Sequence, residues 1–164
     1  MENMTTARWA YLAGLIDGEG SIECQQEMHP KGTTPRFVLR LSFTFATEEP
    51  LATITQWLGV SYKQYPATDE RRSPRYRCQI PKSLAVVVLE HCLPFLILKR
   101  DQAELILEIE RVRAAYSPDR RLIAPGKNRT MPTAAIEQMT VLHAQLRALK
   151  SNKRRMDAPV NRAA

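Results

Sequence analysis

The sequence has few cysteines and histidines, and none of them forms a recognisable disulfide or metal-binding pattern. Its three cysteines, Cys24, Cys78 and Cys92, are odd in number, widely spaced and outside any C-x-x-C pair. This argues against a disulfide framework or a zinc ribbon and favours reduced thiols in an intracellular protein. The three histidines are equally isolated along the chain, so a histidine-ligated metal site is not expected.

The sequence also lacks segments that would direct the chain to or across a membrane. No apolar run approaches the ~18 residues that span a bilayer, and residues 1–6 lack the basic and apolar regions of a secretory signal. Hydrophobic residues make up 44% of the chain, which is enough for a packed core and argues against wholesale disorder. We therefore expect one domain, residues 1–150, followed by a basic, flexible tail, residues 151–164.

The excess of positive charge is confined to the C-terminal third. Residues 1–116 carry 14 charges of each sign, whereas from Ser117 onward ten Lys and Arg stand against three Asp and Glu, so the net charge is +7. Such a segment is typical of a chain that contacts nucleic-acid phosphates. A solvated tail that aids solubility has the same composition, so charge alone leaves both interpretations open.

Small residues line one face of the first predicted helix, residues 6–17. Trp9, Leu12 and Ile16 recur at helical spacing and predict its core face. The small residues are Ala10, Ala13, Gly14 and, one turn on, Gly18. Glycine inside a helix costs ~1 kcal/mol relative to alanine, which is tolerated where two helix backbones approach closely. The alternative is that both glycines simply end a short helix.

Two hairpins are predicted, over residues 21–28 with 36–45 and over residues 60–65 with 75–80. Their period-two patterns give each hairpin one apolar face, as in half-buried antiparallel strands. The outward positions carry Glu23, Gln25, Glu27, His29, Arg36, Arg40, Ser42, Thr44, Gln64, Arg75, Arg77 and Gln79. A polar two-stranded ribbon fits the DNA major groove, where Arg reads guanine and Gln reads adenine. An ordinary solvated sheet face has the same pattern.

Helices are predicted between and after the hairpins. Their approximate ranges are residues 48–58, 82–92, 99–115 and 132–150. For the helix over residues 99–115, the predicted core stripe is Leu98, Leu105, Ile109 and Val112.

Glu19 directly follows the small-residue helix. Phosphodiester hydrolysis uses carboxylates that hold divalent metals, and Mg²⁺ keeps several waters, so one carboxylate and one backbone carbonyl can suffice. If two copies of the helix pack through Ala10 and Gly14, their Glu19 side chains meet at the end of the seam. In an arbitrary chain, however, a single glutamate more often caps a turn or sits in solvent.

Residues 12–20 read LAGLIDGEG, which resembles the signature of the LAGLIDADG homing endonucleases and departs from it only at Gly18 and Glu19. The order of the predicted elements over residues 6–150, the Pro94-Phe95-Leu96 stretch and the loop at residues 117–119 also resemble single-motif members that act as homodimers. The resemblance implies an α+β protein with the αββαββα fold and extra C-terminal helices. In that fold, antiparallel sheets form a DNA-binding saddle.

The resemblance also implies a function. Such a homodimer binds a long pseudo-palindromic double-stranded DNA site and hydrolyses both strands with Mg²⁺, leaving short 3′ overhangs, and Mn²⁺ or Ca²⁺ can substitute in binding. Neither a membrane nor a small-molecule substrate is expected. The alternative is a non-cleaving binder on the same scaffold, either an intron RNA maturase or a DNA-binding regulator. A helix-turn-helix regulator fits less well, because no helix pair has a recognition-helix pattern.

Individual roles follow from the resemblance as well. Glu19 is the expected metal-binding acid, with the Gly18 carbonyl as second ligand, and Lys99 is the expected active-site lysine, which stabilises the transition-state phosphate or orders solvent. Glu49 falls where related enzymes often have a glutamine, so it either holds water near the metal or caps a helix. The expected dimer interface is Ala10, Ala13, Gly14 and Asp17. The expected phosphate contacts are Lys127, Asn128 and Arg129.

Overall fold

The protein is described by a computed structural model that covers residues 4–28, 35–67, 73–116 and 131–156. Its elements are α1 (Thr6–Glu19), β1 (Gly20–Met28), β2 (Pro35–Phe45), α2 (Glu49–Leu58), β3 (Tyr62–Tyr65), β4 (Arg75–Ile80), α3 (Lys82–Cys92), the 3₁₀ helix η1 (Leu93–Phe95), α4 (Arg100–Tyr116) and α5 (Thr133–Met156). The predicted α+β class and αββαββα order, with extra C-terminal helices, are therefore confirmed. Among the described residues, no helix is both long enough and apolar enough to cross a bilayer.

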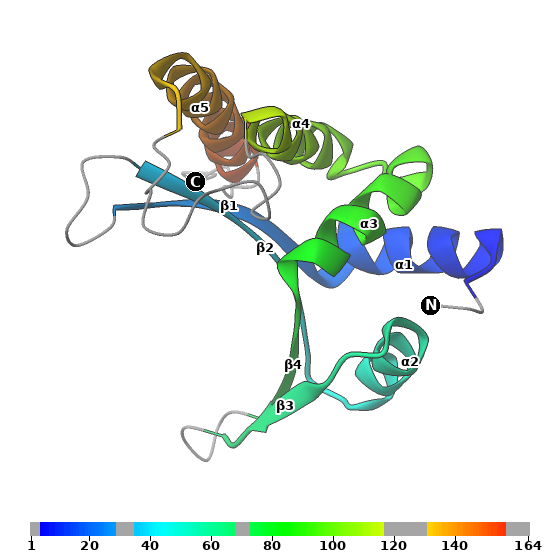
Figure 1. The fold of residues 1–164 in the computed structure, drawn as a ribbon. Coiled ribbons are helices and arrows are strands. Elements are labelled where there is room, and N and C mark those ends of the chain that lie inside the picture. The colour runs from blue at the N-terminus through cyan, green and yellow to red at the C-terminus, as the bar shows by residue number, and fades with distance from the viewer. Residues whose placement is uncertain (1–3, 29–34, 68–72, 117–130, 157–164) are drawn as a thin grey trace, which may run out of the picture.

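The four strands form one antiparallel sheet in the order β1-β2-β4-β3. The long strand β2 is shared, because it pairs with β1 over residues 35–43 and with β4 over residues 41–45. Figure 1 shows that the sheet is strongly curved and that the helices of the described chain lie on its convex side. The concave side is the polar face of the strands, so the fold has the shape of a half-saddle.

The core lies between the convex face of the sheet and the helices. Leu12 and Ile16 of α1 belong to the same buried cluster as Ile22, Leu41 and Phe43 of the sheet, and all five are at most 1% exposed. Each fully buried side chain of this kind contributes roughly 1.5–3 kcal/mol relative to an exposed one. The apolar side chains whose spacing predicts α1 and the first hairpin therefore also pack these two elements together.

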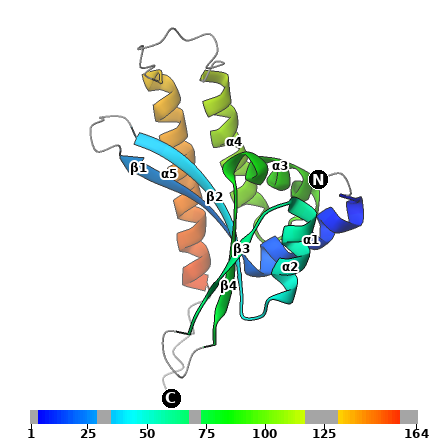
Figure 2. The same ribbon diagram turned by 60° about the horizontal axis from the view of Figure 1, so that its bottom comes forward.

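α5 packs beside α4 and covers the free edge of β1 (Figure 2). The Lys150 ammonium donates to the Ile22 carbonyl at 2.7 Å, and the His143 ring nitrogen Nε2 lies 2.9 Å from the Cys24 carbonyl oxygen. An edge strand exposes unpaired backbone groups, and these two side chains give two of them partners. α5 continues to Met156, six residues beyond the predicted end of the domain.

Leu98, the first residue of the predicted core stripe of α4, is not buried. Leu98 is 62% exposed and precedes the helix, which begins at Arg100. Ala103 and Ile106 are buried in this first part of α4, and Ile109 and Val112 are buried further along, as predicted. Leu98 belongs instead to the segment before α4, whose backbone N–H groups bind a side chain from α1.

Candidate functional site

α1 delivers Glu19 to the centre of the sheet. Glu19 ends the helix and Gly20 begins β1 opposite Phe43, the β2 residue that also pairs with Cys78 of β4. Glu19 therefore lies where the two halves of the sheet overlap, and its side chain is exposed. Gly20 is required by close approach, because a Cβ there would lie 2.7 Å from the Ile16 Cα.

Asp17 points into the chain and binds the segment that precedes α4. Its Oδ2 accepts from the backbone N–H of Ile97 at 2.7 Å and of Leu98 at 3.1 Å, and its Oδ1 accepts from the N–H of Lys99 at 2.8 Å. These N–H groups stand at the start of a helix, where intrahelical acceptors are missing and a negative charge is favoured. Asp17 thus holds α1 and α4 together.

Lys99 makes the converse contact with the end of α1. Its ammonium donates to the carbonyl oxygens of Ile16 at 2.6 Å, Asp17 at 2.8 Å and Gly20 at 2.8 Å. Carbonyl groups at a helix C-terminus carry partial negative charge, so a cation is stabilised there. The Ile16 carbonyl also accepts from the Gly20 N–H, so the ammonium is a second donor to it. Lys99, predicted as an active-site lysine, therefore lies beside the Glu19 segment and is bonded to its backbone.

The acidic side chains at the end of α1 differ in what they contact. Among the described residues, no three His, Cys, Asp or Glu side chains come together in a way that could hold a metal ion. Asp17 is used internally, so Glu19 is the acid of this segment that is available to solvent, with Gly18 exposed beside it. A single carboxylate and a carbonyl oxygen suit a hard cation that keeps several waters.

Glu49 lies in the first turn of α2. Hydrogen bonds from its own backbone N–H and then from the Thr47 side chain lower the pKa of its carboxyl group. Glu48, the residue before it, accepts a hydrogen bond from the Tyr62 hydroxyl, which raises the pKa of Tyr62. These contacts match the helix-start interpretation of Glu49, and its role near a metal stays a prediction.

The strand register places most of the predicted outward residues on the concave face. They are Glu23, Gln25, Glu27, Arg36, Arg40, Ser42, Thr44, Arg75, Arg77 and Gln79. Ser42 shares this face but is only 7% exposed. His29, Lys127, Asn128 and Arg129 lie outside the described residues.

Gln64 is the exception, since it pairs with Tyr76 and therefore lies on the opposite face. Lys63 pairs with Arg77 and Tyr65 pairs with Arg75, so these two residues take the concave positions that were expected of Gln64. The register between β3 and β4 sets these positions, and no pattern within the four residues of β3 indicates it.

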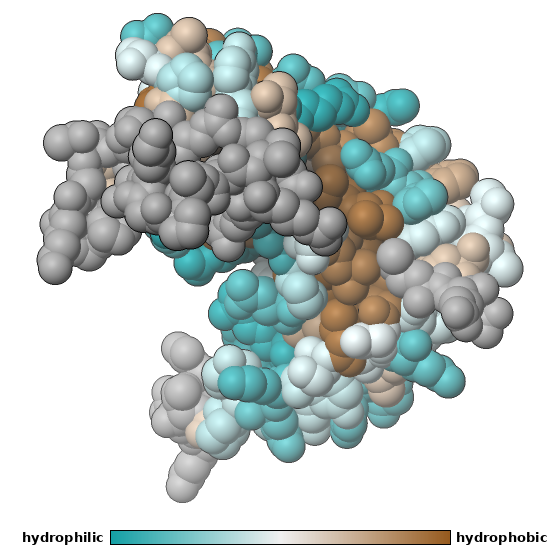
Figure 3. All heavy atoms as spheres, in the orientation of Figure 1, coloured by the Kyte–Doolittle hydropathy of each residue, from teal (hydrophilic) through white to brown (hydrophobic). Residues whose placement is uncertain are grey.

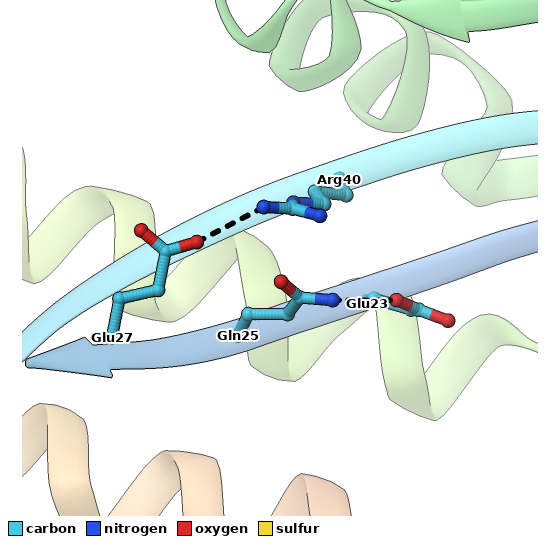
Figure 4. A network of polar contacts seen from close by, with 4 residues as sticks. All are labelled: Glu23, Gln25, Glu27 and Arg40. Carbon is cyan, nitrogen blue, oxygen red and sulfur yellow. Dashed lines mark hydrogen bonds and ion pairs between the residues drawn. The ribbon is translucent and has the colours of Figure 1, made fainter.

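Acidic side chains on this face orient their polar neighbours (Figure 4). Arg40 lies opposite Glu23 in the register but forms its ion pair with Glu27 at 3.0 Å. Glu23 accepts instead from the Ser21 hydroxyl at 3.0 Å and from the Gln25 amide at 3.3 Å. The face therefore carries a guanidinium and an amide whose directions are set by carboxylates.

A second exposed surface runs along α1. Ala10, Gly14 and Gly18 are exposed at helical spacing, whereas Ala13, also predicted at the dimer interface, is fully buried in the core of its own chain. Apolar side chains next to this helix are exposed as well: Tyr11 is 51% exposed and Ile97 is 83% exposed. Figure 3 shows apolar surface over the region of α1 and α3, beside the hydrophilic hollow of the sheet.

The curved sheet, the buried helix motif and the exposed acid at its end define the fold of the LAGLIDADG homing endonucleases. The chain is similar to the archaeal intron-encoded homing endonuclease I-Vdi141I in complex with DNA, with a TM-score of 0.63 and 18% identity over 87% of this chain and 84% of that one. It is also similar to I-CvuI bound to its target in the presence of Ca, with a TM-score of 0.51 and 24% identity over 86% and 95%.

A third similar structure is considerably longer. I-SmaMI bound to cleaved DNA matches with a TM-score of 0.58 and 16% identity over 92% of this chain but only 49% of its own. No family model matches the sequence, and no curated protein matches it either. At these identities the similarity establishes the fold, and it confirms at that level the resemblance seen in residues 12–20.

Proposed function

We propose that the chain is a LAGLIDADG homing endonuclease that cleaves a specific double-stranded DNA site as a homodimer. The observation that carries the proposal is the position of Glu19, an exposed carboxylate at the centre of a polar, concave sheet. A duplex lying in that concavity would bring a phosphodiester to the carboxylate. The same helix that ends at Glu19 presents an exposed strip of small residues to a second copy.

The concave face supplies the chemistry for reading DNA. Arg40, Arg75 and Arg77 can donate two hydrogen bonds to guanine, and Gln25 and Gln79 can pair with adenine. Glu23 and Glu27 are unusual on such a face, but carboxylates accept from cytosine N4. The similar structures I-Vdi141I and I-CvuI are complexes with DNA, which supports this use of the fold.

Glu19 and the Gly18 carbonyl oxygen would hold the divalent metal. Mg²⁺ supplies an activated water and stabilises charge on the leaving oxygen when bound. I-CvuI was crystallised with Ca and with Mg, which supports the use of such an ion on this fold. Within the chain, Glu19 provides the ligand charge, Gly20 allows the tight turn, and Asp17 and Lys99 fix the backbone on either side. Cleavage of both strands would leave short 3′ overhangs.

The glycines of α1 support the homodimer. Among the described residues, nothing lies within 4 Å of a Cβ built at Gly14 or Gly18, so packing within the chain does not require glycine at either position. A glycine in a helix costs ~1 kcal/mol relative to alanine, and close contact with another helix would offset that cost. Two copies of this chain would also match the length of I-SmaMI, about half of which one copy spans.

The proposal is tested by selecting cleaved sites from a randomised DNA library in Mg²⁺. A palindromic consensus is expected, because two identical subunits read two identical half-sites. Glu19→Gln should abolish cleavage and retain specific binding, whereas the control Glu104→Gln, on α4 away from the concave face, should cleave normally. Binding without cleavage by the wild type would favour a maturase or a regulator, and full activity of Glu19→Gln would remove the metal assignment.

A further inference from the structure

We propose that Lys99 and Asp17 form a reciprocal clamp that positions Glu19, so that Lys99 is a positioning residue. Each of the two side chains binds the backbone on the other's side: the Asp17 carboxylate binds the N–H groups of the three residues before α4. The Lys99 ammonium binds two carbonyl groups of α1 and the carbonyl of Gly20, the first residue of β1. The inference rests on the proposed function, since it concerns how the metal-binding acid is held.

The carbonyls that Lys99 binds bracket the metal-binding segment. The Asp17 and Gly20 carbonyl oxygens, both 2.8 Å from the ammonium, lie on either side of Gly18 and Glu19 in the chain. A single cation thereby fixes the backbone before and after both expected metal ligands. Because catalytic groups need placement within about half an ångström, such a contact controls how well the ligands fit an ion.

Electrostatics favour both halves of the clamp. An anion at the start of α4 and a cation at the end of α1 each oppose the partial charges of those helix termini. All six hydrogen bonds involve one ionised partner, which makes them stronger than neutral ones. Three backbone carbonyl oxygens lie within 2.8 Å of the Lys99 ammonium, which is the geometry of a support for the site.

The clamp predicts a particular kinetic signature in Lys99→Met. Losing a group that supports metal ligands typically weakens metal affinity by about 10- to 100-fold. The half-saturating Mg²⁺ concentration for cleavage should therefore rise by about 10-fold or more, while the rate at saturating Mg²⁺ stays within a few-fold of wild type. Asp17→Asn, which keeps the size of the side chain, should shift the Mg²⁺ dependence in the same direction. Rates are measured below the melting temperature of each variant.

Arg100→Met is the matched control, because Arg100 is the next cation in the chain and pairs with Glu104 on the surface of α4. It should leave the Mg²⁺ dependence unchanged. A large loss of maximal rate in Lys99→Met with an unchanged half-saturating concentration would mean that Lys99 acts on the reacting phosphate. If neither the half-saturating Mg²⁺ concentration nor the maximal rate changes, Lys99 makes only a structural contact. Both results overturn the clamp.

The clamp and the proposed function fail in different ways. A wild-type protein that cuts no DNA would refute the nuclease. The clamp is then tested by the rise in melting temperature that Mn²⁺ causes in the presence of bound DNA. Lys99→Met should reduce that rise and Arg100→Met should preserve it, and an equal rise in both variants would overturn the clamp.

Discussion

Glu110 of α4 should make the stability of this protein depend on pH. Its side chain is only 11% exposed and forms ion pairs with Lys82 of α3, at 3.1 Å, and with Arg113 one turn further along α4. Burial raises the pKa of Glu110 from its ordinary value of 4.5 to about 7. Two cations would by themselves lower this pKa, so desolvation of the carboxylate is the larger effect.

The sign of the pH dependence follows from the direction of this shift. Below the unfolded-state pKa, Glu110 is protonated in both states, and between the two pKa values only the folded state keeps the proton. The contribution of Glu110 to stability is therefore largest below the unfolded-state pKa and is lost as the pH rises through the folded-state pKa of about 7. At about 1.36 kcal/mol per unit, the whole shift is worth roughly 3 kcal/mol, and roughly 2 to 3 kcal/mol of it falls between pH 5 and pH 8.

The assay compares wild type with Glu110→Gln by urea unfolding at several values between pH 5 and pH 8. Because glutamine does not titrate, the free energy of unfolding of the variant minus that of the wild type should increase with pH by roughly 2 to 3 kcal/mol. Glu108→Gln removes a carboxylate from a site on the same helix whose side chain is 42% exposed, and reports the effect of the charge alone. A difference that stays flat or falls with pH would refute the reasoning, because it would mean that Lys82 and Arg113 keep Glu110 ionised.

Two further predictions concern the exposed surfaces. Gly14→Leu should shift the protein from dimer to monomer in sedimentation velocity while each chain stays folded, since space around Gly14 is open within the chain; unchanged sedimentation would remove the α1 seam. Glu27→Gln should release Arg40 from its ion pair and remove one negative charge from the concave face, so binding to random-sequence DNA should tighten several-fold and the preference at one base pair per half-site should weaken. Unchanged binding to both kinds of DNA would show that Glu27 does not face the duplex.

Local patterns in the sequence predict most of the fold. The first hairpin has eleven residues in its second strand, so the period-two pattern assigns its faces without ambiguity. β3 has only four residues, Tyr62 to Tyr65. One face carries a tyrosine and a glutamine, and the other carries a lysine and a tyrosine. Such a short strand has no apolar face that would assign its two sides. Its register with β4 places Lys63 and Tyr65 on the concave face of the sheet and Gln64 on the opposite face.

The contacts of the site depend on residues far apart in the sequence. Leu98 has the right spacing for the core of α4, but the Asp17 carboxylate binds its backbone N–H and the helix begins two residues later. The motif in residues 12–20 indicates that Asp17 and Glu19 matter, yet it cannot indicate that one points inward and the other outward. Only the packing of α1 against the start of α4 separates their roles.

If the proposed homodimer forms, this separation would link its assembly to its chemistry within one stretch of chain. Asp17 and Lys99 fix the end of α1 from inside, and Gly20 permits the close backbone approach that follows Glu19. Gly14 and Gly18 weaken the same helix by ~1 kcal/mol each, and no contact with the described part of the chain requires either glycine. If close contact with a second α1 offsets that cost, the interaction that stabilises the helix is also the one that brings two Glu19 carboxylates together. The metal site would then form only in the dimer. An isolated chain would hold one Glu19 carboxylate in the correct position but would lack the second.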